Sequence, residues 1–331
     1  MKALLLESVK IMPLYKDVEI PRPGAGEVLV KIAAAALNHR DLYIAQGLYP
    51  GIVTPVILGS DGAGTVVETG ASVSKDLQGM DVLINPNINW GDNPKVQDKK
   101  YNILGMPTNG TLAAFVCVKA DRLAPKPDHL TFAQAAALPL AGLTAYRALF
   151  TKADLKNGEK LLISGIGGGV ALIAFQMALA LGAEVWVTSG ADDKIELALQ
   201  LGAKGGINYK SENWHKALEI KAGGGFDVIL DSAGGDGFQY FLDLANPAAR
   251  IVFYGGTRGS FKVNPQKMFW KQLSMYGSTM GNDSDFNNML ALIIQHQIVP
   301  FVRDQRPLSE GAAAFADMDE GKQFGKLVLI P

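Results

Sequence analysis

The sequence predicts an α/β protein of two domains, one rich in β-strands and the other containing a doubly wound parallel sheet. Three observations lead to this prediction. The chain has 331 residues, enough for two hydrophobic cores of ordinary size. Short β-type runs separated by turn residues fill the sequence up to about residue 120. From Pro125 onward, strand patterns alternate with helical patterns, which is typical of a parallel sheet covered by helices on both faces.

The N-terminal elements are predicted from short apolar runs that Gly, Pro or Asp residues separate. These runs span residues 2–8, 27–37, 64–70, 81–86 and 112–118. Between residues 85 and 110 the sequence is polar and lacks a regular period, so we expect a long lobe or loop in that interval.

The middle of the chain has the element order of a doubly wound sheet. Strands are expected at 161–164, 184–189, 206–209, 226–231 and 250–256. Helices are expected at 131–138, 141–150, 170–181, 193–202 and 236–244. Because crossovers between parallel strands are right-handed, these helices should cover both faces of the sheet.

The C-terminal elements follow in the order helix, strand, helix and strand. They are expected at 285–297, 298–304, 309–321 and 326–331. The middle sheet is already complete, so we expect the last strand to return to the first domain. The expected domains are therefore residues 1–123 with 297–331, and residues 124–296.

Composition and charge exclude several classes of protein. Hydrophobic residues make up 48% of the chain and charged residues 19%, which indicates packed cores rather than disorder. The formal net charge of −1 leaves no basic face to bind nucleic acid. Cys117 is the lone cysteine, which excludes a disulfide framework and a multi-cysteine zinc lobe. The longest apolar stretch, 170–181, contains Gln176 and is too short to span a bilayer, and no signal-peptide pattern follows Met1. We therefore expect a cytoplasmic protein with no membrane contact.

The strongest motif is a glycine-rich turn between a buried strand and a long helix. The predicted strand ends at Ser164, and the turn and the start of the helix comprise Gly165, Gly167, Gly168, Gly169 and Val170. Free N–H groups and the positive end of the helix dipole face such a turn, which suits a pyrophosphate. A glycine-rich turn alone is a weak signal. The preceding strand, the following helix and a second strand end about twenty residues on favour a dinucleotide site over a purely structural turn.

The end of the second strand indicates which dinucleotide binds. Sites for NAD usually carry Asp or Glu there, which accepts from the ribose 2′-hydroxyl. Ser189 removes that charge and leaves space for a 2′-phosphate, which Lys194 and the Tyr209 hydroxyl could contact. The cofactor is therefore expected to be NADP(H). The alternative is that Lys194 is a solvated helix lysine, and the adjacent acids at 192–193 argue against a phosphate there.

Ten ordered segments resemble the medium-chain dehydrogenase/reductase superfamily nearly from end to end. They are GEVLVKI, LNHRDLYIAQGLYP, LGSDGAGTVVETG, NGTLAAFVCV, AAALPLAGLTAYRAL, SGIGGGVA, LALGAEV, LGAKGGINY, FDVILDSAGG and FGKLVLIP. The resemblance implies that residues 1–123 and 297–331 form a GroES-like β-barrel catalytic domain. It also implies that residues 124–296 form a Rossmann domain for NADP(H), with the active site in the cleft between the domains.

The zinc ligands of the metal-containing relatives are replaced in this chain. Those relatives hold catalytic zinc with Cys, His and Cys, and the matching positions are Asn38, Ser60 and Leu140. Leucine cannot bind a metal, and the segment matching the structural zinc lobe, 85–110, has no cysteine. We therefore expect no metal. The alternative, a fortuitous metal site, would use the nearby His39, Asp41 and Asp61.

The pattern is closer to the zinc-free quinone oxidoreductase-like branch, whose members are often labelled zinc-binding dehydrogenases. The resemblance implies that His39 and Lys326 contact the pyrophosphate and that Thr144 packs against the nicotinamide. It further implies that the loops bordering the ribose and nicotinamide contain Ser232, Ala233, Gly255 and Ser278.

Without zinc, the favoured substrates are those in which a conjugated system delocalises the charge that hydride transfer creates. A few hydrogen-bond donors can then hold the enolate or phenolate oxygen. We expect Asn38 and Tyr43 or Tyr49 to be those donors, with Arg40 as an electrostatic helper. Each has a structural alternative: Asn38 could hold a turn, the tyrosines could be packing residues, and Arg40 could pair with an acid.

The predicted function is NADPH-dependent hydride transfer to a quinone or an α,β-unsaturated carbonyl compound, so the expected partner is a small-molecule substrate. The alternatives are an alcohol or aldehyde dehydrogenase of the same superfamily and a non-catalytic NADPH-binding protein. The resemblance also implies a homodimer or homotetramer, joined through edge strands of the Rossmann sheet. We expect those edges at residues 250–256 and 269–277.

Overall fold

The structure is a computed structural model that describes residues 1–321 and 323–331. Its contacts group these residues into a terminal unit, Met1–Ala141 with Asn282–Pro331, and a central unit, Gly142–Gly281. This grouping counts residues 124–141 and 282–296 with the terminal unit, whereas the sequence interpretation assigned them to the central domain. The boundaries expected from the sequence stay a prediction.

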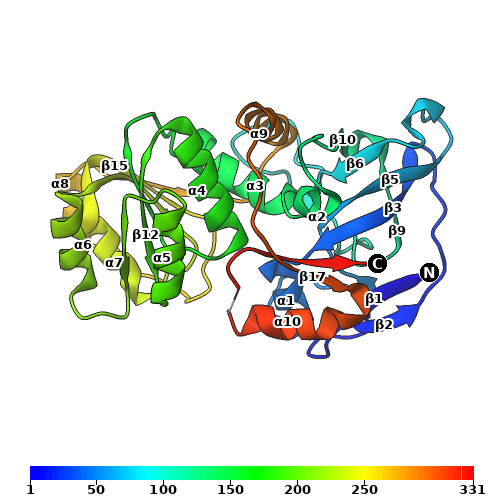
Figure 1. The fold of residues 1–331 in the computed structure, drawn as a ribbon, viewed down its shortest axis with the longest axis horizontal. Helices are drawn as coiled ribbons and strands as arrows, with labels where there is room; N and C mark the ends of the chain where they lie inside the picture. Colours follow the sequence, from blue (N-terminus) through cyan, green and yellow to red (C-terminus); the bar gives the residue numbers. More distant parts are fainter. Residues whose placement is uncertain (322) are drawn as a thin grey trace. The chain divides into compact units, whose positions relative to one another are not determined.

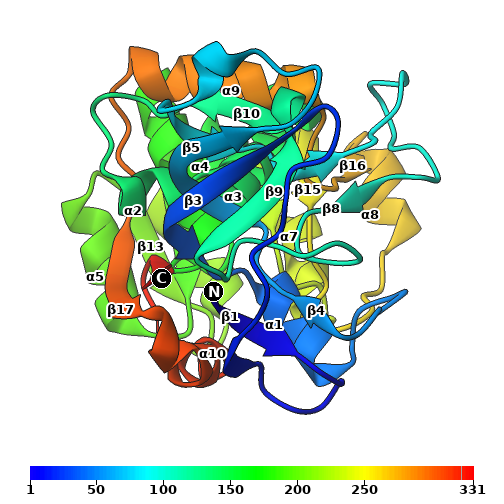
Figure 2. The same cartoon turned by 90° about the vertical axis from the view of Figure 1, so that its right-hand side faces the viewer.

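The terminal unit is built around strand β3. Its sequence is strongly apolar, and the strand pairs with a neighbour on each side. Figure 2 shows β3 between β5 and β9, and both pairings are antiparallel. The main sheet runs in the order β10-β6-β5-β3-β18-β17, with β9 also on β3, and a smaller sheet runs β2-β1-β4. The strands are β1 (Lys2–Leu6), β2 (Leu14–Asp17), β3 (Glu27–Ala36), β4 (Val56–Ile57), β5 (Asp61–Thr69), β6 (Asp81–Ile84), β9 (Phe115–Lys119), β10 (Leu123–Pro125), β17 (Val302–Pro307) and β18 (Lys326–Ile330).

The last strand returns to the first sheet, as the sequence predicts. Strand β18 pairs antiparallel with β3, with Val328 opposite Ala36. The polar interval between residues 85 and 110 contains a small hairpin of β7 (Asn87–Ile88) and β8 (Asn102–Ile103). The helices of the terminal unit are α1 (His39–Gln46), α2 (Phe132–Ala136), α9 (Asp283–Gln295) and α10 (Gly311–Asp319). Helix α3 (Pro139–Tyr146) contains the boundary between the units.

The central unit is the predicted doubly wound sheet. All its strand pairs are parallel, in the order β13-β12-β11-β14-β15-β16. Figure 1 shows α4, α5, α6, α7 and α8 around this sheet. The strands are β11 (Lys160–Ile163), β12 (Glu184–Ser189), β13 (Gly205–Asn208), β14 (Phe226–Asp231), β15 (Ala245–Phe253) and β16 (Ser274–Gly277). The helices are α4 (Gly169–Leu181), α5 (Asp192–Gln200), α6 (Trp214–Ala222), α7 (Gln239–Leu244) and α8 (Pro265–Trp270). The order reverses between β11 and β14, where sheets of this type bind their ligands.

The expectation that residues 250–256 form a sheet edge is wrong. Residues 250–253 of this segment lie in β15, which pairs with β14 on one side and β16 on the other. Within the second predicted edge, only Ser274–Gly277 is a strand, because residues 269 and 270 end helix α8. Strand β16 is therefore the edge on this side of the sheet. Separately, none of the helices in the described ranges is long and apolar enough to cross a membrane.

Candidate functional site

A polar cluster begins where β3 ends and α1 starts. Asn38 has an extended backbone, with φ −125° and ψ 151°, immediately before the helix. Its backbone N–H donates to Asp41 Oδ2 at 2.9 Å, and the Gly59 N–H donates to Asp41 Oδ1 at 3.2 Å. The buried Asp41 carboxylate thus ties the first turn of α1 to the chain after β4. Burial raises the pKa of Asp41, and the neighbouring Arg40 guanidinium opposes that rise.

Asn38, Asp61 and Lys326 form a hydrogen-bonded triangle inside the terminal unit. Lys326 Nζ donates to Asn38 Oδ1 at 2.6 Å and to Asp61 Oδ2 at 2.9 Å. Asn38 Nδ2 donates to the same Asp61 oxygen at 2.9 Å, and the Leu140 N–H donates to the other at 2.7 Å. Asp61 is fully buried, while Lys326 and Asn38 are 4% and 7% exposed. A charge pair this buried needs hydrogen bonds to offset its lost hydration, and the triangle supplies them.

Both Nη atoms of Arg40 have hydrogen-bond partners within the terminal unit, whereas its buried Nε has none among the described residues. Its Nη atoms donate to Ser60 Oγ at 3.0 Å and to carbonyl oxygens in the 103–106 segment at 2.9 to 3.2 Å. Its carbon Cζ also lies 5.2 Å from the centre of the Tyr49 ring. These contacts fasten the 85–110 segment to the loop before β5. They favour a structural role, and the catalytic role of Arg40 stays a prediction.

Tyr43 and His39 lie one helical turn apart on α1, with ring centres 6.2 Å apart. Partial burial, followed by the charge of Asp319, raises the pKa of Tyr43, so its hydroxyl stays protonated and can donate. The His39 side chain reaches the surface, yet partial desolvation and then the charge of Lys326 lower its pKa. A lowered pKa keeps the imidazole neutral at pH 7, so any attraction to a phosphate would strengthen only at more acidic pH.

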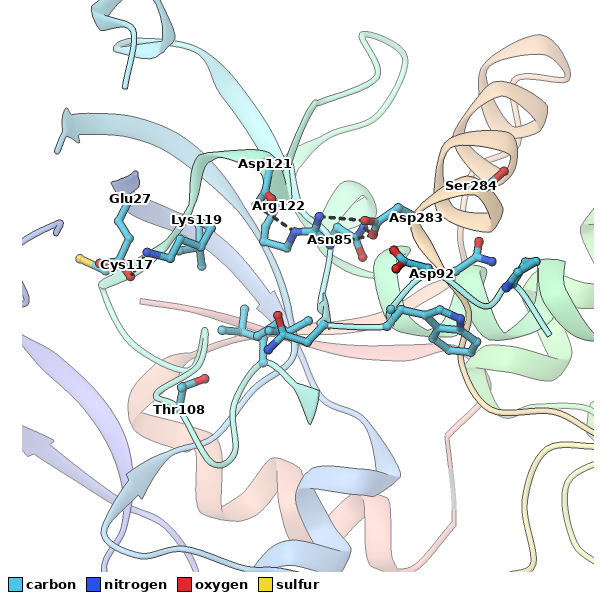
Figure 3. Close-up of a pocket in the computed structure, with 18 residues that line it drawn as sticks. Glu27, Asn85, Asp92, Thr108, Cys117, Lys119, Asp121, Arg122, Asp283 and Ser284 are labelled. Atoms are coloured by element: carbon cyan, nitrogen blue, oxygen red, sulfur yellow. Dashed lines mark hydrogen bonds and ion pairs between the residues drawn. The ribbon is translucent and has the colours of Figure 1, made fainter. Parts of the chain in front are cut away.

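A pocket of about 560 Å³ opens elsewhere in the terminal unit, and none of the four predicted catalytic residues lines it. Figure 3 shows Arg122 joined to Asp283 and Asp121 in its wall. Burial acts to raise the pKa of Asp283, but hydrogen bonds, above all from Arg122, bring it below its ordinary value. Because Asn38 of the buried triangle is the predicted catalytic donor and does not line this pocket, we favour the triangle as the reacting centre.

The donor set around the triangle does not fit a zinc ion. Asn38 Oδ1 already accepts from an ammonium group, Ser60 Oγ accepts from Arg40, and Leu140 has no donor atom in its side chain. Within residues 1–321 and 323–331, no group of three or more His, Cys, Asp or Glu side chains could hold a metal.

The glycine-rich turn of the central unit leads from β11 into α4. Gly165 and Gly167 have φ values of 67° and 128°, which L-residues with a Cβ rarely adopt. The Ile166 N–H donates to Thr188 O at 2.8 Å and holds the turn against β12. A Cβ on Gly168 would meet nothing within 4 Å, so the space before the helix N-terminus is open. Gly169 and Val170 begin the helix. This cradle fits a dinucleotide pyrophosphate.

Asp231, at the end of β14, organises the neighbouring loops. Its buried carboxylate accepts from Ser164 Oγ, from the Ala233 N–H at 3.1 Å and from the Gly234 N–H at 2.7 Å. The Arg258 N–H donates to Ala233 O at 2.8 Å, which links this loop to the one after β15. The ends of three adjacent strands are thereby held in one arrangement.

Ser189 and Tyr209 lie together where β12 and β13 end. Ser189 is buried, and its Oγ accepts from the Ala191 N–H at 3.2 Å. A Cβ on Gly190 would lie 2.7 Å from Tyr209 Oη, so that hydroxyl sits against the end of β12. Arg258 Nη2 donates to Tyr209 Oη at 3.2 Å, and its Cζ lies 4.9 Å from the ring centre. The predicted Lys194 lies in the first turn of α5.

The residues expected around the nicotinamide lie in the same unit. Thr144 is buried on α3. A Cβ on Gly255 would lie 2.5 Å from Ser232 O, so only glycine fits between these loops. The buried Ser278 Oγ has no hydrogen-bond partner in the described part of the chain. A buried hydroxyl without a partner is uncommon, and a bound amide group would satisfy it.

Sequence reasoning missed two charged residues of these sites. Arg258 was not selected, because no pattern brings it next to Tyr209, 49 positions away. Asp231 ends a predicted strand, and a carboxylate just after a buried strand was a signal that could have found it. Lys326 was selected, but its expected role was contact with a pyrophosphate, whereas its ammonium donates to Asn38 and Asp61.

Comparisons with known proteins agree with the two-part organisation. A family model described as "Alcohol dehydrogenase GroES-like domain" matches residues 24–128, and one described as "Zinc-binding dehydrogenase" matches residues 169–295. The "Zinc-type alcohol dehydrogenase-like protein YogA" of Leptosphaeria maculans is 37% identical, over 93% of this chain and 92% of its own length. The "Quinone oxidoreductase" of Mus musculus is 29% identical, over 97% and 94%. A solved "NAD-dependent alcohol dehydrogenase" superposes with a TM-score of 0.93 at 32% identity, and each chain is covered completely.

Proposed function

Because this chain belongs to the medium-chain dehydrogenase/reductase superfamily and is an NAD(P)H-dependent oxidoreductase, we propose that it reduces a quinone or an α,β-unsaturated carbonyl compound with NADPH and without catalytic zinc. One observation carries the proposal. By the sequence resemblance, Asn38, Ser60 and Leu140 match the zinc-ligand positions of the metal-containing relatives, and the Lys326 ammonium donates a hydrogen bond to the Asn38 oxygen. Relatives named quinone oxidoreductase support the substrate class.

Without catalytic zinc, hydride transfer depends on the hydrogen-bond donors that can stabilise the substrate oxygen. Bound NADPH would supply the hydride, which adds to a carbon of the conjugated acceptor and leaves the electron pair on its oxygen. Asn38 Nδ2 has one hydrogen on Asp61 and a second that can donate to this oxygen. A proton from water then gives the saturated ketone or, with a quinone, the ene-dione that enolises to the hydroquinone. Tyr43 or Tyr49 would be a second hydrogen-bond donor to the same oxygen, because a phenolic hydroxyl can share its negative charge.

The preference for NADPH over NADH is supported by the end of β12. Ser189 puts no carboxylate there, and the Tyr209 hydroxyl and Arg258 guanidinium lie beside it. Arginine binds phosphate through several directed N–H groups, so this pair suits a 2′-phosphate. A ribose 2′-hydroxyl would gain much less from the same groups.

Replacing Arg258 with glutamine is expected to weaken NADPH binding by about tenfold and to leave NADH binding within about twofold, because one charge-assisted contact is lost. Nicotinamide fluorescence titration of both cofactors measures this. Lys262→Gln is the matched control, since Lys262 is an exposed cation on the same loop. An equal loss for both cofactors would show that Arg258 shapes the loop instead of binding the 2′-phosphate.

The substrate class is tested by a panel of quinones, enones, enals, simple aldehydes and alcohols, each with NADPH and NADH. Turnover of conjugated acceptors by metal-depleted protein is the expected result. The alternative of an alcohol dehydrogenase is favoured by the names of two relatives, both "zinc-type alcohol dehydrogenase-like". One tightly bound zinc per chain, with alcohol oxidation that chelation abolishes, would establish that alternative. Cofactor binding without any turnover would favour the non-catalytic NADPH-binding protein.

We propose that the expected homodimer forms through an interface at the edge strand β16. Trp270 is 85% exposed, and Phe269 beside it is also largely exposed at the end of α8, close in sequence to this edge. An unpaired strand edge beside exposed aromatic rings is costly in water, and a second copy can cover both through antiparallel pairing across a two-fold axis.

Trp270→Glu is therefore expected to convert the dimer into a monomer, because a carboxylate would be buried in the apolar contact. Sedimentation velocity measures the change. Ile220→Glu is the matched control: Ile220 is 82% exposed on α6, which follows β13 at the opposite edge. A dimer that survives Trp270→Glu but not Ile220→Glu would move the interface to the β13 side.

A further inference from the structure

We infer that the buried Lys326–Asp61 ion pair fixes the Asn38 amide so that its second N–H is offered to the substrate oxygen. The inference rests on the proposed function and names the groups that make Asn38 competent. It also gives Lys326 a different role from the pyrophosphate contact that the sequence resemblance implies. Lys326 would then be a positioning residue.

The two partners of Asn38 settle the orientation of its amide. An ammonium group can only donate, so the atom 2.6 Å from Lys326 Nζ must be the amide oxygen. A carboxylate can only accept, so the atom 2.9 Å from Asp61 Oδ2 must be the amide nitrogen. A flipped amide would face a cation with its N–H groups and an anion with its oxygen. The pair therefore excludes the flipped state and leaves one N–H of known direction.

The same contacts strengthen that N–H as a donor. The ammonium draws electron density toward Oδ1, and hydrogen bonds in series polarise one another in a low-dielectric site. Burial keeps water from screening the effect, since Lys326 is 4% exposed and Asp61 is fully buried. Asp61 holds the ammonium in place through the direct 2.9 Å contact. A fixed cation thus acts on the substrate through a neutral amide.

The identities of the replaced ligands agree with this arrangement. Where a zinc site needs a thiolate, asparagine can accept from the ammonium and still donate outward, which a thiolate cannot do. At the third ligand position, Leu140 contributes its backbone N–H to Asp61 at 2.7 Å. Two of the former ligand positions therefore serve the ion pair.

The test is a double-mutant cycle between Asn38→Ala and the neutral pair Lys326→Met with Asp61→Asn. Removing both charges together avoids leaving one buried charge unpaired. We expect the neutral pair to lower kcat by about 30-fold and to change the Kd of NADPH by less than about twofold. Asn38→Ala should cost about 100-fold in the wild type but less than about fivefold in the neutral background, because the amide is no longer oriented there. Lys326→Arg, which keeps a cationic donor, should retain kcat within about fivefold.

A readout that needs no substrate separates this inference from the proposed function. In ¹⁵N-labelled protein, the N–H groups of the Asn38 side-chain amide should exchange slowly with solvent, and this exchange should become rapid in the neutral pair. If that signature holds but no conjugated acceptor is reduced, the substrate class fails and the positioning role stands. Three results would overturn the inference: fully additive losses in kcat, an Arg variant as impaired as the neutral pair, or a tenfold loss of NADPH affinity. A tenfold loss of NADPH affinity would instead support a contact between Lys326 and the pyrophosphate.

Discussion

Replacing Ser189 with aspartate is expected to weaken NADPH binding by about 100-fold and to leave NADH binding nearly unchanged. Ser189 is buried where β12 ends, and its Oγ already accepts from the Ala191 N–H. A carboxylate at that place would face the 2′-phosphate, and the repulsion between the two anions in a partly desolvated site amounts to about 3 kcal/mol. With NADH, the same carboxylate could accept from the ribose 2′-hydroxyl, which offsets the cost of burying it.

Fluorescence titration with both cofactors gives the ratio of dissociation constants directly. Ser189→Asn is the matched control, because asparagine has the size of aspartate without its charge and should shift both affinities by a similar, smaller factor. Thermal denaturation of each variant without cofactor shows whether the loops after β12 and β13 remain folded. Equal affinities of the wild type for NADPH and NADH would contradict the preference before any variant is made.

The doubly wound sheet could be predicted because its signal is local. Apolar runs such as 161–164 and 226–231 are short enough for strands, and the glycine-rich turn follows the first of them directly. The strand order is harder to read. Of the two expected edges, 269–277 contains the edge strand β16, Ser274–Gly277, whereas 250–256 belongs partly to β15, which is paired on both sides.

The side-chain contacts of the site, unlike the strands and helices, could not be predicted from local sequence patterns. Lys326 and Asp61 are 265 positions apart, and they meet because β18 and β5 both pair with β3. A sequence gives the residue type at each position, but only the register of these strands decides which side chains share a buried space. The same limit applies to Arg258, which meets Tyr209 through two loops that end different strands. Asn38 and Lys326 could be selected because motifs contain them, whereas their contacts with each other and with Asp61 could not be predicted.

Asn38→Ala is expected to lower kcat by about 100-fold toward a quinone or enone while the Kd of NADPH changes by less than about twofold. The amide N–H would bind the oxygen more tightly as negative charge builds on it, so its loss falls on the transition state more than on the ground state. KM should therefore change less than kcat. The direct contact between Lys326 and Asp61 at 2.9 Å survives the substitution, so the variant should stay folded.

Asn85→Ala is the matched control for this substitution. Asn85 is another buried asparagine of the terminal unit, but its Nδ2 donates to Asp283 at 3.0 Å, outside the triangle. It should lower thermal stability about as much as Asn38→Ala and leave kcat within about threefold. If both variants lose the same activity, or if Asn38→Ala keeps wild-type kcat, Asn38 only caps α1 and the charge on the substrate oxygen must be held elsewhere. If only Asn38→Ala loses kcat while the two variants are equally stable, the loss cannot come from unfolding. The Asn38 amide would then be identified as the group that binds the substrate oxygen.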